Sequence, residues 1–251
     1  MRINDFYDEL ANWSFDDISY ISENFTNWNY EEEIKKIINS SSRVLDLGTA
    51  AGEKVIKYYP DCVEILGTDL SKSMIENANK NLLESGRKNI SFRVMNNLEM
   101  DTPDDYFNLV TARHTAINPV QIYNTLKKDG RIIVRGVDKL DCWTLKRMFN
   151  RGQAYNDVKP ISLMDYEAIL DAGFKDVELI PLHVIEYYKT KDDLLALLLK
   201  TPILFEFSEC KDIEYENKTI ESNIFENYVK ENTTEKGIKL VRRYYGITGR
   251  K

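Results

Sequence analysis

The sequence contains few of the residues that build metal centres, disulfides or membrane spans. Its 251 residues include three cysteines and two histidines, which are scattered without the short spacings of metal ligands. We therefore expect no metal, and the odd number of dispersed cysteines favours a reducing compartment such as the cytoplasm. No apolar run approaches the roughly 20 residues that a membrane span needs, and the first residues lack the apolar core of a secretion signal.

An excess of positive charge is also lacking. The formal net charge is −7, so the chain as a whole lacks the basic footprint of a nucleic-acid-binding surface. Basic residues do gather in residues 236–251, and we interpret them as a strand that balances an acidic body. A composition of 43% hydrophobic and 30% charged residues is ordinary for a globular protein. We expect neither a nucleic-acid nor a membrane partner, and the oligomeric state stays open.

The most informative stretch of the chain is residues 42–54. A short apolar run, residues 44–47, indicates a buried strand. Small residues follow from Gly48 to Gly52, and a helix pattern begins at Glu53. A strand that passes through small residues into a helix leaves backbone N–H groups available to a ligand and lets the ligand approach the main chain closely.

The positions of the glycines separate two families of nucleotide-binding turn. The dinucleotide fingerprint needs three glycines, Gly-x-Gly-x-x-Gly, but its second and third places hold Ala50 and Glu53 here. A glutamate fits the third place poorly. The pattern Asp46-x-Gly48-x-Ala50-x-Gly52 instead resembles motif I of the class I S-adenosylmethionine (SAM)-dependent methyltransferases, which usually have glycine where Ala50 stands.

The second predicted strand, residues 63–69, ends in the acidic residue Asp69. It follows the glycine turn by about 20 residues, the distance at which such folds place a carboxylate on ribose hydroxyls. A carboxylate suits this position because it accepts hydrogen bonds from two vicinal hydroxyls. The spacing alone does not separate SAM from NAD. The resemblance implies that Asp69 binds the ribose and that Leu70 lies against the adenine.

The third predicted strand comprises residues 90–95. The segment that follows it resembles the segment with which members of this family contact the adenine. Asn96 stands where the family usually has aspartate, and Asn97 follows it. The resemblance implies that both residues contact the adenine, Asn96 through its carbonyl oxygen.

The fourth predicted strand, residues 109–112, leads into Arg113 and His114. In the family this strand end lies beneath the methionine part of SAM. Arg113 is a candidate partner for a carboxylate of the cofactor or of the substrate. His114 is a candidate general base because its pKa range suits the role; the alternative is a hydrogen-bonded structural histidine. The implied cofactor-binding residues are Asp46, Gly48, Thr49, Ala50, Gly52, Asp69, Leu70, Asn96, Asn97 and Arg113, with His114 as the candidate catalytic residue.

The alternation of patterns predicts a Rossmann-like α/β fold in a single domain, residues 1–251. We expect a doubly wound seven-stranded sheet with six parallel strands and one antiparallel strand. Residues 1–40, rich in aromatics, are predicted to form an N-terminal helical cap, either as a lid over the pocket or as a cover for one face of the sheet. A helical insertion is predicted at residues 190–237, before the last strand. The predicted strands are residues 44–47, 63–69, 90–95, 109–112, 131–136, 174–180 and 240–248.

The resemblance implies an enzyme that transfers the methyl group of SAM directly to an acceptor, with S-adenosylhomocysteine (SAH) as the product. The sulfonium methyl is already electrophilic, so the protein mainly aligns the reactants and excludes water. We expect a small-molecule acceptor, with anionic ones as the first candidates, because four arginines could build a cationic pocket: Arg113, Arg135, Arg147 and Arg151. An RNA or protein acceptor comes second. Alternatives from other classes are a non-catalytic SAM-binding protein and an NAD(P)-dependent oxidoreductase.

Overall fold

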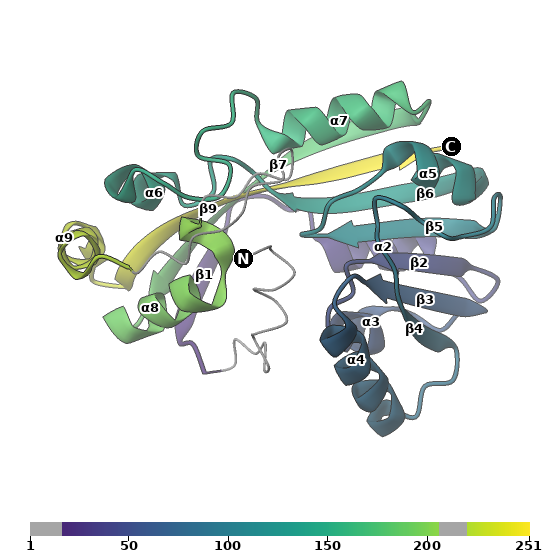
Figure 1. Cartoon of the computed structure of the whole chain (residues 1–251), viewed down its shortest axis with the longest axis horizontal. Helices are drawn as coiled ribbons and strands as arrows, with labels where there is room; N and C mark the ends of the chain where they lie inside the picture. Colours follow the sequence, from purple (N-terminus) through teal and green to yellow (C-terminus); the bar gives the residue numbers. More distant parts are fainter. Residues whose placement is uncertain (1–16, 206–219) are drawn as a thin grey trace. The chain divides into compact units, whose positions relative to one another are not determined.

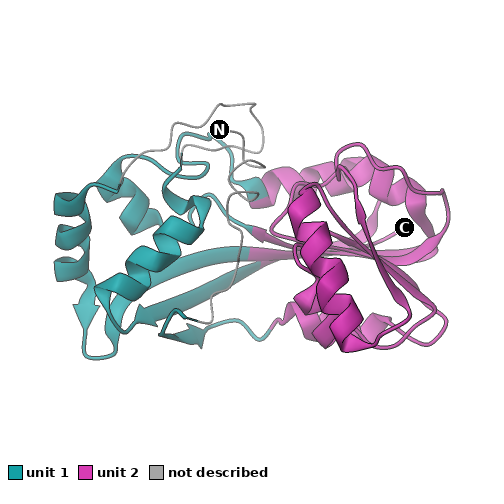
Figure 2. Ribbon diagram, turned by 60° about the horizontal axis from the view of Figure 1, so that its bottom comes forward, with its two compact units in different colours: residues 1–27, 137–161, 181–244 teal, residues 28–136, 162–180, 245–251 magenta. Residues whose placement is uncertain are grey.

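The computed structural model describes residues 17–205 and 220–251. The chain divides into two compact units (Figure 2). Unit 1 comprises residues 1–27, 137–161 and 181–244, and unit 2 comprises residues 28–136, 162–180 and 245–251. No helix in the described ranges combines the length and the apolar character that a membrane crossing requires.

The described residues contain nine strands, and Figure 1 labels all of them except β8. They are β1 (Tyr20–Asn24), β2 (Arg43–Leu47), β3 (Glu64–Asp69), β4 (Ile90–Val94), β5 (Phe107–Arg113), β6 (Leu126–Val137), β7 (Lys175–Tyr188), β8 (Thr233–Thr234) and β9 (Gly237–Arg250). Their order in the sheet is β1-β7-β9-β6-β5-β2-β3-β4, and β8 pairs with β9.

The helices alternate with these strands in the first half of the chain. They are α2 (Tyr30–Ile37), α3 (Glu53–Tyr58), α4 (Lys72–Ser85), α5 (Pro119–Thr125), α6 (Trp143–Phe149), α7 (Ile161–Asp171), α8 (Lys191–Lys200), the 3-10 helix η1 (Pro202–Leu204) and α9 (Ser222–Asn232). The sequence explains the ends of α4. Ser71 caps its first turn by accepting a hydrogen bond from the Met74 amide, and Gly86 ends it in the left-handed conformation.

Unit 2 contains the parallel part of the sheet. Strand β2 pairs in parallel with β3 on one side and with β5 on the other, while β4 pairs with β3 and β6 with β5. The chain therefore changes direction across the sheet between β2 and β5, and α/β folds bind their ligands at the carboxyl ends of the strands at such a point. Helix α4 packs against β3 and β4.

The core of unit 2 joins the strands to the helices that cover them. Side chains from the middle of β2, β3 and β5 are fully buried, as the apolar runs of these strands predict for parallel strands. Helices α2, α3 and α4 add apolar residues at helical spacing. The buried set includes Tyr30, Ile34, Val44, Val55, Ile65, Ile75, Leu109 and Ile133.

Unit 1 packs its own core from α6, α8, η1 and α9 with parts of β7 and β9. Its polar centre is Arg242, which is buried. The Arg242 guanidinium donates to both oxygens of Asp141, at 2.9 and 3.0 Å, and to Glu186 at 3.1 Å. A buried arginine needs such bidentate partners, because an unpaired charge in the core is costly.

All seven predicted strands are present, and the mostly parallel Rossmann-like architecture is confirmed. The sheet gains β8, a two-residue strand that pairs with β9, and β1, where the sequence predicts part of a helical cap. Residues 20–24 become a strand because they pair antiparallel with β7, and the Tyr20 and Tyr188 rings stack at 5.3 Å. Tertiary pairing here overrides the local pattern.

The structure describes only part of the expected cap and part of the expected insertion. Residues 1–16 of the expected cap lie outside the described residues, and α2 is its described helix. The described residues of the expected insertion, 190–237, form α8, η1, α9 and β8, and they belong to unit 1.

Asp165 makes the stability of unit 2 depend on pH. This α7 carboxyl is partly buried, and the Tyr245 hydroxyl donates a hydrogen bond to its Oδ2 at 2.5 Å. Burial raises the pKa of Asp165 to about 6, and the hydrogen bond opposes the shift only in part. Between about pH 4 and pH 6 the folded state keeps a proton that the unfolded chain has lost. Stability therefore falls as the pH rises through this window.

We predict that Asp165→Asn removes this pH dependence. The amide keeps an acceptor for Tyr245 but cannot ionise. The free energy of unfolding of the variant should therefore be higher than that of the wild type by about 1–3 kcal/mol at neutral pH, and nearly equal to it near pH 4. Urea denaturation of both proteins across this range measures the difference. Parallel pH profiles would contradict the assignment.

Candidate active site

The turn after β2 is built around left-handed backbone. Gly48, Ala50 and Gly52 have φ values of 71°, 49° and 76°. A Cβ on Gly48 would lie 2.6 Å from the Cβ of Thr115, and a Cβ on Gly52 would lie 2.5 Å from the Phe92 ring. Both positions therefore require glycine, for space as well as for conformation. Ala50 adopts a conformation that costs an L-residue about 1–2 kcal/mol, which is a physical reason for the glycine that the family usually has there.

Asp69, the last residue of β3, holds this turn. Its Oδ2 accepts a hydrogen bond from the Ala50 amide at 2.9 Å, and its Oδ1 accepts one from the Ser71 amide at 3.0 Å. Its own carbonyl accepts from the Met95 amide at 3.0 Å, which ties the end of β4 to the same place. The carboxylate is thus oriented at the carboxyl edge of the sheet. Each carboxylate oxygen can accept more than one hydrogen bond, so these contacts orient the group without excluding hydroxyl donors of a ligand.

Asp46 lies beneath the turn and is buried. Its Oδ1 accepts hydrogen bonds from the Tyr59 hydroxyl at 2.6 Å and from the Thr111 hydroxyl at 2.7 Å. Burial raises the pKa of the Asp46 carboxyl, and these two hydrogen bonds act against that shift. The structure therefore places Asp46 as an internal acceptor that joins β2, β5 and the end of α3.

The two asparagines predicted to read adenine make different contacts. The Oδ1 of Asn96 accepts from the Leu98 amide at 3.0 Å and so closes a short turn. Asn97 is buried, donates to the Thr115 hydroxyl at 2.9 Å and accepts from the Thr68 hydroxyl at 3.4 Å. Because Thr115 abuts Gly48, the Asn97 side chain supports the glycine turn from below.

Arg113 and His114 follow each other at the end of β5. Arg113 is the register partner of Arg135 in β6, and its Nε is buried without a hydrogen-bond partner among the described residues. His114 has a left-handed backbone, with φ 53°, and its amide donates to the Arg135 carbonyl at 2.8 Å.

The side chain of Arg135 also contacts His114, through Nη1 and the imidazole Nε2. A guanidinium can only donate, so Nε2 is the acceptor in this contact and the ring proton lies on Nδ1. A base role for Nε2 would require this contact to break. Catalysis by His114 stays a prediction.

The cationic pocket expected from four arginines is not assembled within one unit. Arg113 and Arg135 belong to unit 2, whereas Arg147 and Arg151 belong to unit 1. Arg151 is buried in unit 1, where it donates to the Leu204 carbonyl at 3.3 Å and to Glu221 at 2.9 Å. These contacts give Arg151 a structural role.

Several residues that shape the site were missed from the sequence. Phe92 fills the space beside Gly52 and Gly67, since a Cβ on Gly67 would lie 2.6 Å from its ring. Thr68 and Thr115 complete the support of the turn. No local pattern marks such residues, because they meet only through the register of neighbouring strands.

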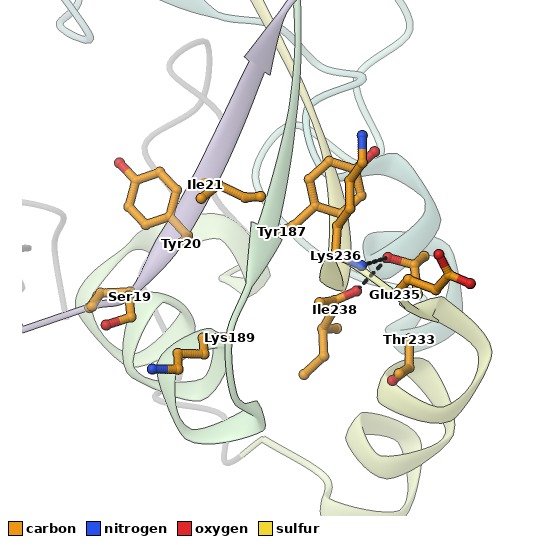
Figure 3. Close-up of a pocket in the computed structure, with 12 residues that line it drawn as sticks. Ser19, Tyr20, Ile21, Tyr187, Lys189, Thr233, Glu235, Lys236 and Ile238 are labelled. Carbon is orange, nitrogen blue, oxygen red and sulfur yellow. Dashed lines mark hydrogen bonds between the residues drawn. The ribbon is translucent and has the colours of Figure 1, made fainter.

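Unit 1 carries a surface groove of about 620 Å³ (Figure 3). It lies between β1, the end of β7 and the β8–β9 hairpin. The Lys236 ammonium pairs with Glu23 and lies 5.4 Å from the centre of the Tyr187 ring. None of the residues predicted to bind SAM lines this groove.

The fold and the turn define the class of this protein. A mostly parallel sheet, a glycine-containing turn at its switch point and an acidic residue at the end of the next strand are the features of a class I SAM-dependent methyltransferase fold. The family model described as a methyltransferase domain matches residues 38–194. This range covers more than half of the chain, which therefore belongs to that family.

The similarity of the chain to a known methyltransferase agrees with this assignment. The chain is 28% identical over 149 residues to an uncharacterized methyltransferase of Bacillus subtilis, YcgJ. The match covers 54% of this chain and 59% of that relative, so it spans less than two thirds of the relative's length.

Solved structures share the fold. The crystal structure of YcgJ matches 88% of this chain and 96% of its own, with a TM-score of 0.57 and 19% identity. The structure of a functionally unknown protein from Deinococcus radiodurans covers 99% of this chain and 98% of its own, with a TM-score of 0.61 and 13% identity. A third structure is that of phosphoethanolamine N-methyltransferase 2 of Haemonchus contortus, solved with phosphomonomethylethanolamine and SAH. The match covers 90% of this chain and 53% of that one, with a TM-score of 0.52 and 16% identity.

We predict that Gly48→Ala destabilises the protein by about 1–3 kcal/mol, because the new Cβ must enter the space of Thr115 in a left-handed conformation. Ala50→Gly is the matched control: it relieves backbone strain and should change stability by less than about 1 kcal/mol. Chemical denaturation compares the two variants with the wild type. Equal effects at both positions would refute the turn geometry.

We also predict that Asn97→Ala lowers the stability of the protein without ligand by about 1–3 kcal/mol, since the buried amide contacts to the hydroxyls of Thr68 and the half-buried Thr115 are lost. Asn96→Ala, which removes only a local turn contact, should cost clearly less. If Asn97 instead acted by reading adenine, its variant would keep its stability without ligand and lose only affinity for SAH. Thermal unfolding with and without SAH separates the two roles.

Proposed function

We propose that this chain is a SAM-dependent methyltransferase that acts on a small-molecule acceptor. The observation that carries the proposal is the glycine turn after β2, with the Asp69 carboxylate hydrogen-bonded to its Ala50 amide. Membership of the methyltransferase family supports the reaction type.

The residues of the turn fit an adenosyl amino acid. The absence of side chains at Gly48 and Gly52 lets a ligand approach the backbone. Asp69 would accept hydrogen bonds from the ribose hydroxyls, and Leu70, which is 43% exposed, would cover one face of the adenine. Arg113 would pair with the carboxylate of the amino-acid part, because its buried Nε has no partner among the described residues. Thr49 and Asn96 would complete the contacts, with Asp46 and Asn97 supporting the turn from inside.

SAM, when bound, supplies a methyl group on a positively charged sulfur, which is already electrophilic. The chain's own residues then have to hold the acceptor in line and exclude water, a contribution of orientation. No side chain of the site has to form a covalent bond. An acceptor that reacts as a neutral amine or as an anion needs no base, and the contact between His114 and Arg135 agrees with such an acceptor.

The oxidoreductase alternative is weaker for a physical reason. Glu53 stands where a dinucleotide-binding turn needs its third glycine, and it is exposed as the first residue of α3. A carboxylate at this place would oppose the pyrophosphate of a dinucleotide. RNA as acceptor is disfavoured by the net charge of −7. A non-catalytic SAM-binding protein would share every cofactor contact, and only turnover with an acceptor separates it from an enzyme.

Calorimetric titration of an Asp69→Ala variant with SAH tests the proposed function. We expect its affinity to be lower than that of the wild type by about 1–3 kcal/mol, or roughly fivefold to 150-fold, because the ribose hydroxyls lose their acceptor. Asp104→Ala removes an exposed carboxylate between β4 and β5 and should leave the affinity unchanged. Unchanged affinity in Asp69→Ala would refute the ribose assignment.

A further inference from the structure

Two arginines lie side by side near the carboxyl ends of neighbouring strands in unit 2. The parallel register of β5 and β6 pairs Arg113 with Arg135, so the two side chains leave the same face of the sheet. Like charges directly opposite each other in a sheet are unfavourable. An anion bound between the two guanidinium groups would offset this repulsion.

The surroundings of Arg113 show that one of these charges lacks a full set of protein partners. Its Nε is buried and has no hydrogen-bond partner among the described residues. The Asp46 carboxylate acts on Arg113 through its charge, but it takes its own hydrogen bonds from Tyr59 and Thr111. A buried guanidinium nitrogen without a partner costs free energy, and an anionic ligand would offset this cost.

His114 contacts Arg135 through both its backbone and its side chain. Its amide and its imidazole Nε2 both contact Arg135, which fixes the ring against the guanidinium and leaves the proton on Nδ1. The left-handed φ of 53° at His114 is a strained backbone for a residue other than glycine. Strain of this kind is typical of functional sites, where the surrounding structure maintains it.

We propose that Arg135, together with His114, binds an anionic group of the methyl acceptor, a carboxylate or a phosphate. This inference rests on the proposed function, in which Arg113 pairs with the single carboxylate of the cofactor. One planar guanidinium suffices for that carboxylate through two parallel hydrogen bonds. The second guanidinium, beside it in register, then selects an acceptor that carries a negative charge of its own.

The test uses the full chain saturated with SAH, so that the cofactor carboxylate occupies its own site. Inorganic phosphate and, separately, acetate are titrated at an ionic strength held constant with chloride, and the thermal unfolding midpoint is recorded. The wild type should show a saturable rise with at least one of the two anions. Arg135→Gln should weaken this response at least tenfold, and Arg135→Lys should restore part of it because the charge is kept.

Arg131→Gln is the matched control. Arg131 is exposed and lies on the same strand, four residues earlier. The substitution is again arginine to glutamine, so the loss of charge is the same. It should respond to the anions as the wild type does. An equal response in the wild type, Arg135→Gln and Arg131→Gln would overturn the proposal as a general salt effect, and so would the lack of a saturable response in the wild type.

The SAH titration of each variant separates this proposal from the proposed function. If SAH binds and Arg135→Gln responds to anions like the wild type, the acceptor subsite is wrong while the methyltransferase assignment stands. If SAH fails to bind the wild type, the proposed function fails, and the acceptor assignment fails with it. Affinity for SAH within about twofold of the wild type in Arg135→Gln is expected, since the variant leaves the cofactor residues in place.

Discussion

The hydrogen bond from the Ala50 amide to the Asp69 carboxylate is the contact on which the proposed site depends. It joins the left-handed turn after β2 to the end of β3, at 2.9 Å. The same carboxylate accepts from the Ser71 amide, and Ser71 in turn caps α4. One side chain thus fixes the turn, the strand end and the start of the next helix relative to one another. A ligand that meets this edge encounters a preformed surface, which reduces the ordering that binding must impose.

Beneath this contact, the strand ends are joined by buried polar side chains. Asp46 binds the hydroxyls of Tyr59 and Thr111, and Asn97 links Thr68 to Thr115. Buried polar groups of this kind are stable only when each finds a partner. These side chains hold the ends of β2, β3, β4 and β5 in fixed register below a turn made of small residues.

The sequence predicted the parts of the fold that depend on local pattern. The apolar run before Gly48 and the acidic end of β3 are local signals, and each lies where it was expected. Strand β1 was missed because its pairing with β7 is a contact between residues far apart in the chain. The inward contacts of Asn97 were missed for the same reason, since its partners come from β3 and from the segment after β5. Spacing along the chain also does not reveal that Arg151, one of the four arginines of the expected cationic pocket, pairs with Glu221.

We propose that the turn after β2 binds an adenosyl amino acid and not a dinucleotide. The most direct test is calorimetric titration of the wild-type protein with SAH and, separately, with NADH. We expect the protein to bind SAH at micromolar concentration and not to bind NADH, because Glu53 takes the place of the third glycine. Binding of NADH without binding of SAH would contradict the account and remove the basis for the methyltransferase activity proposed for this chain.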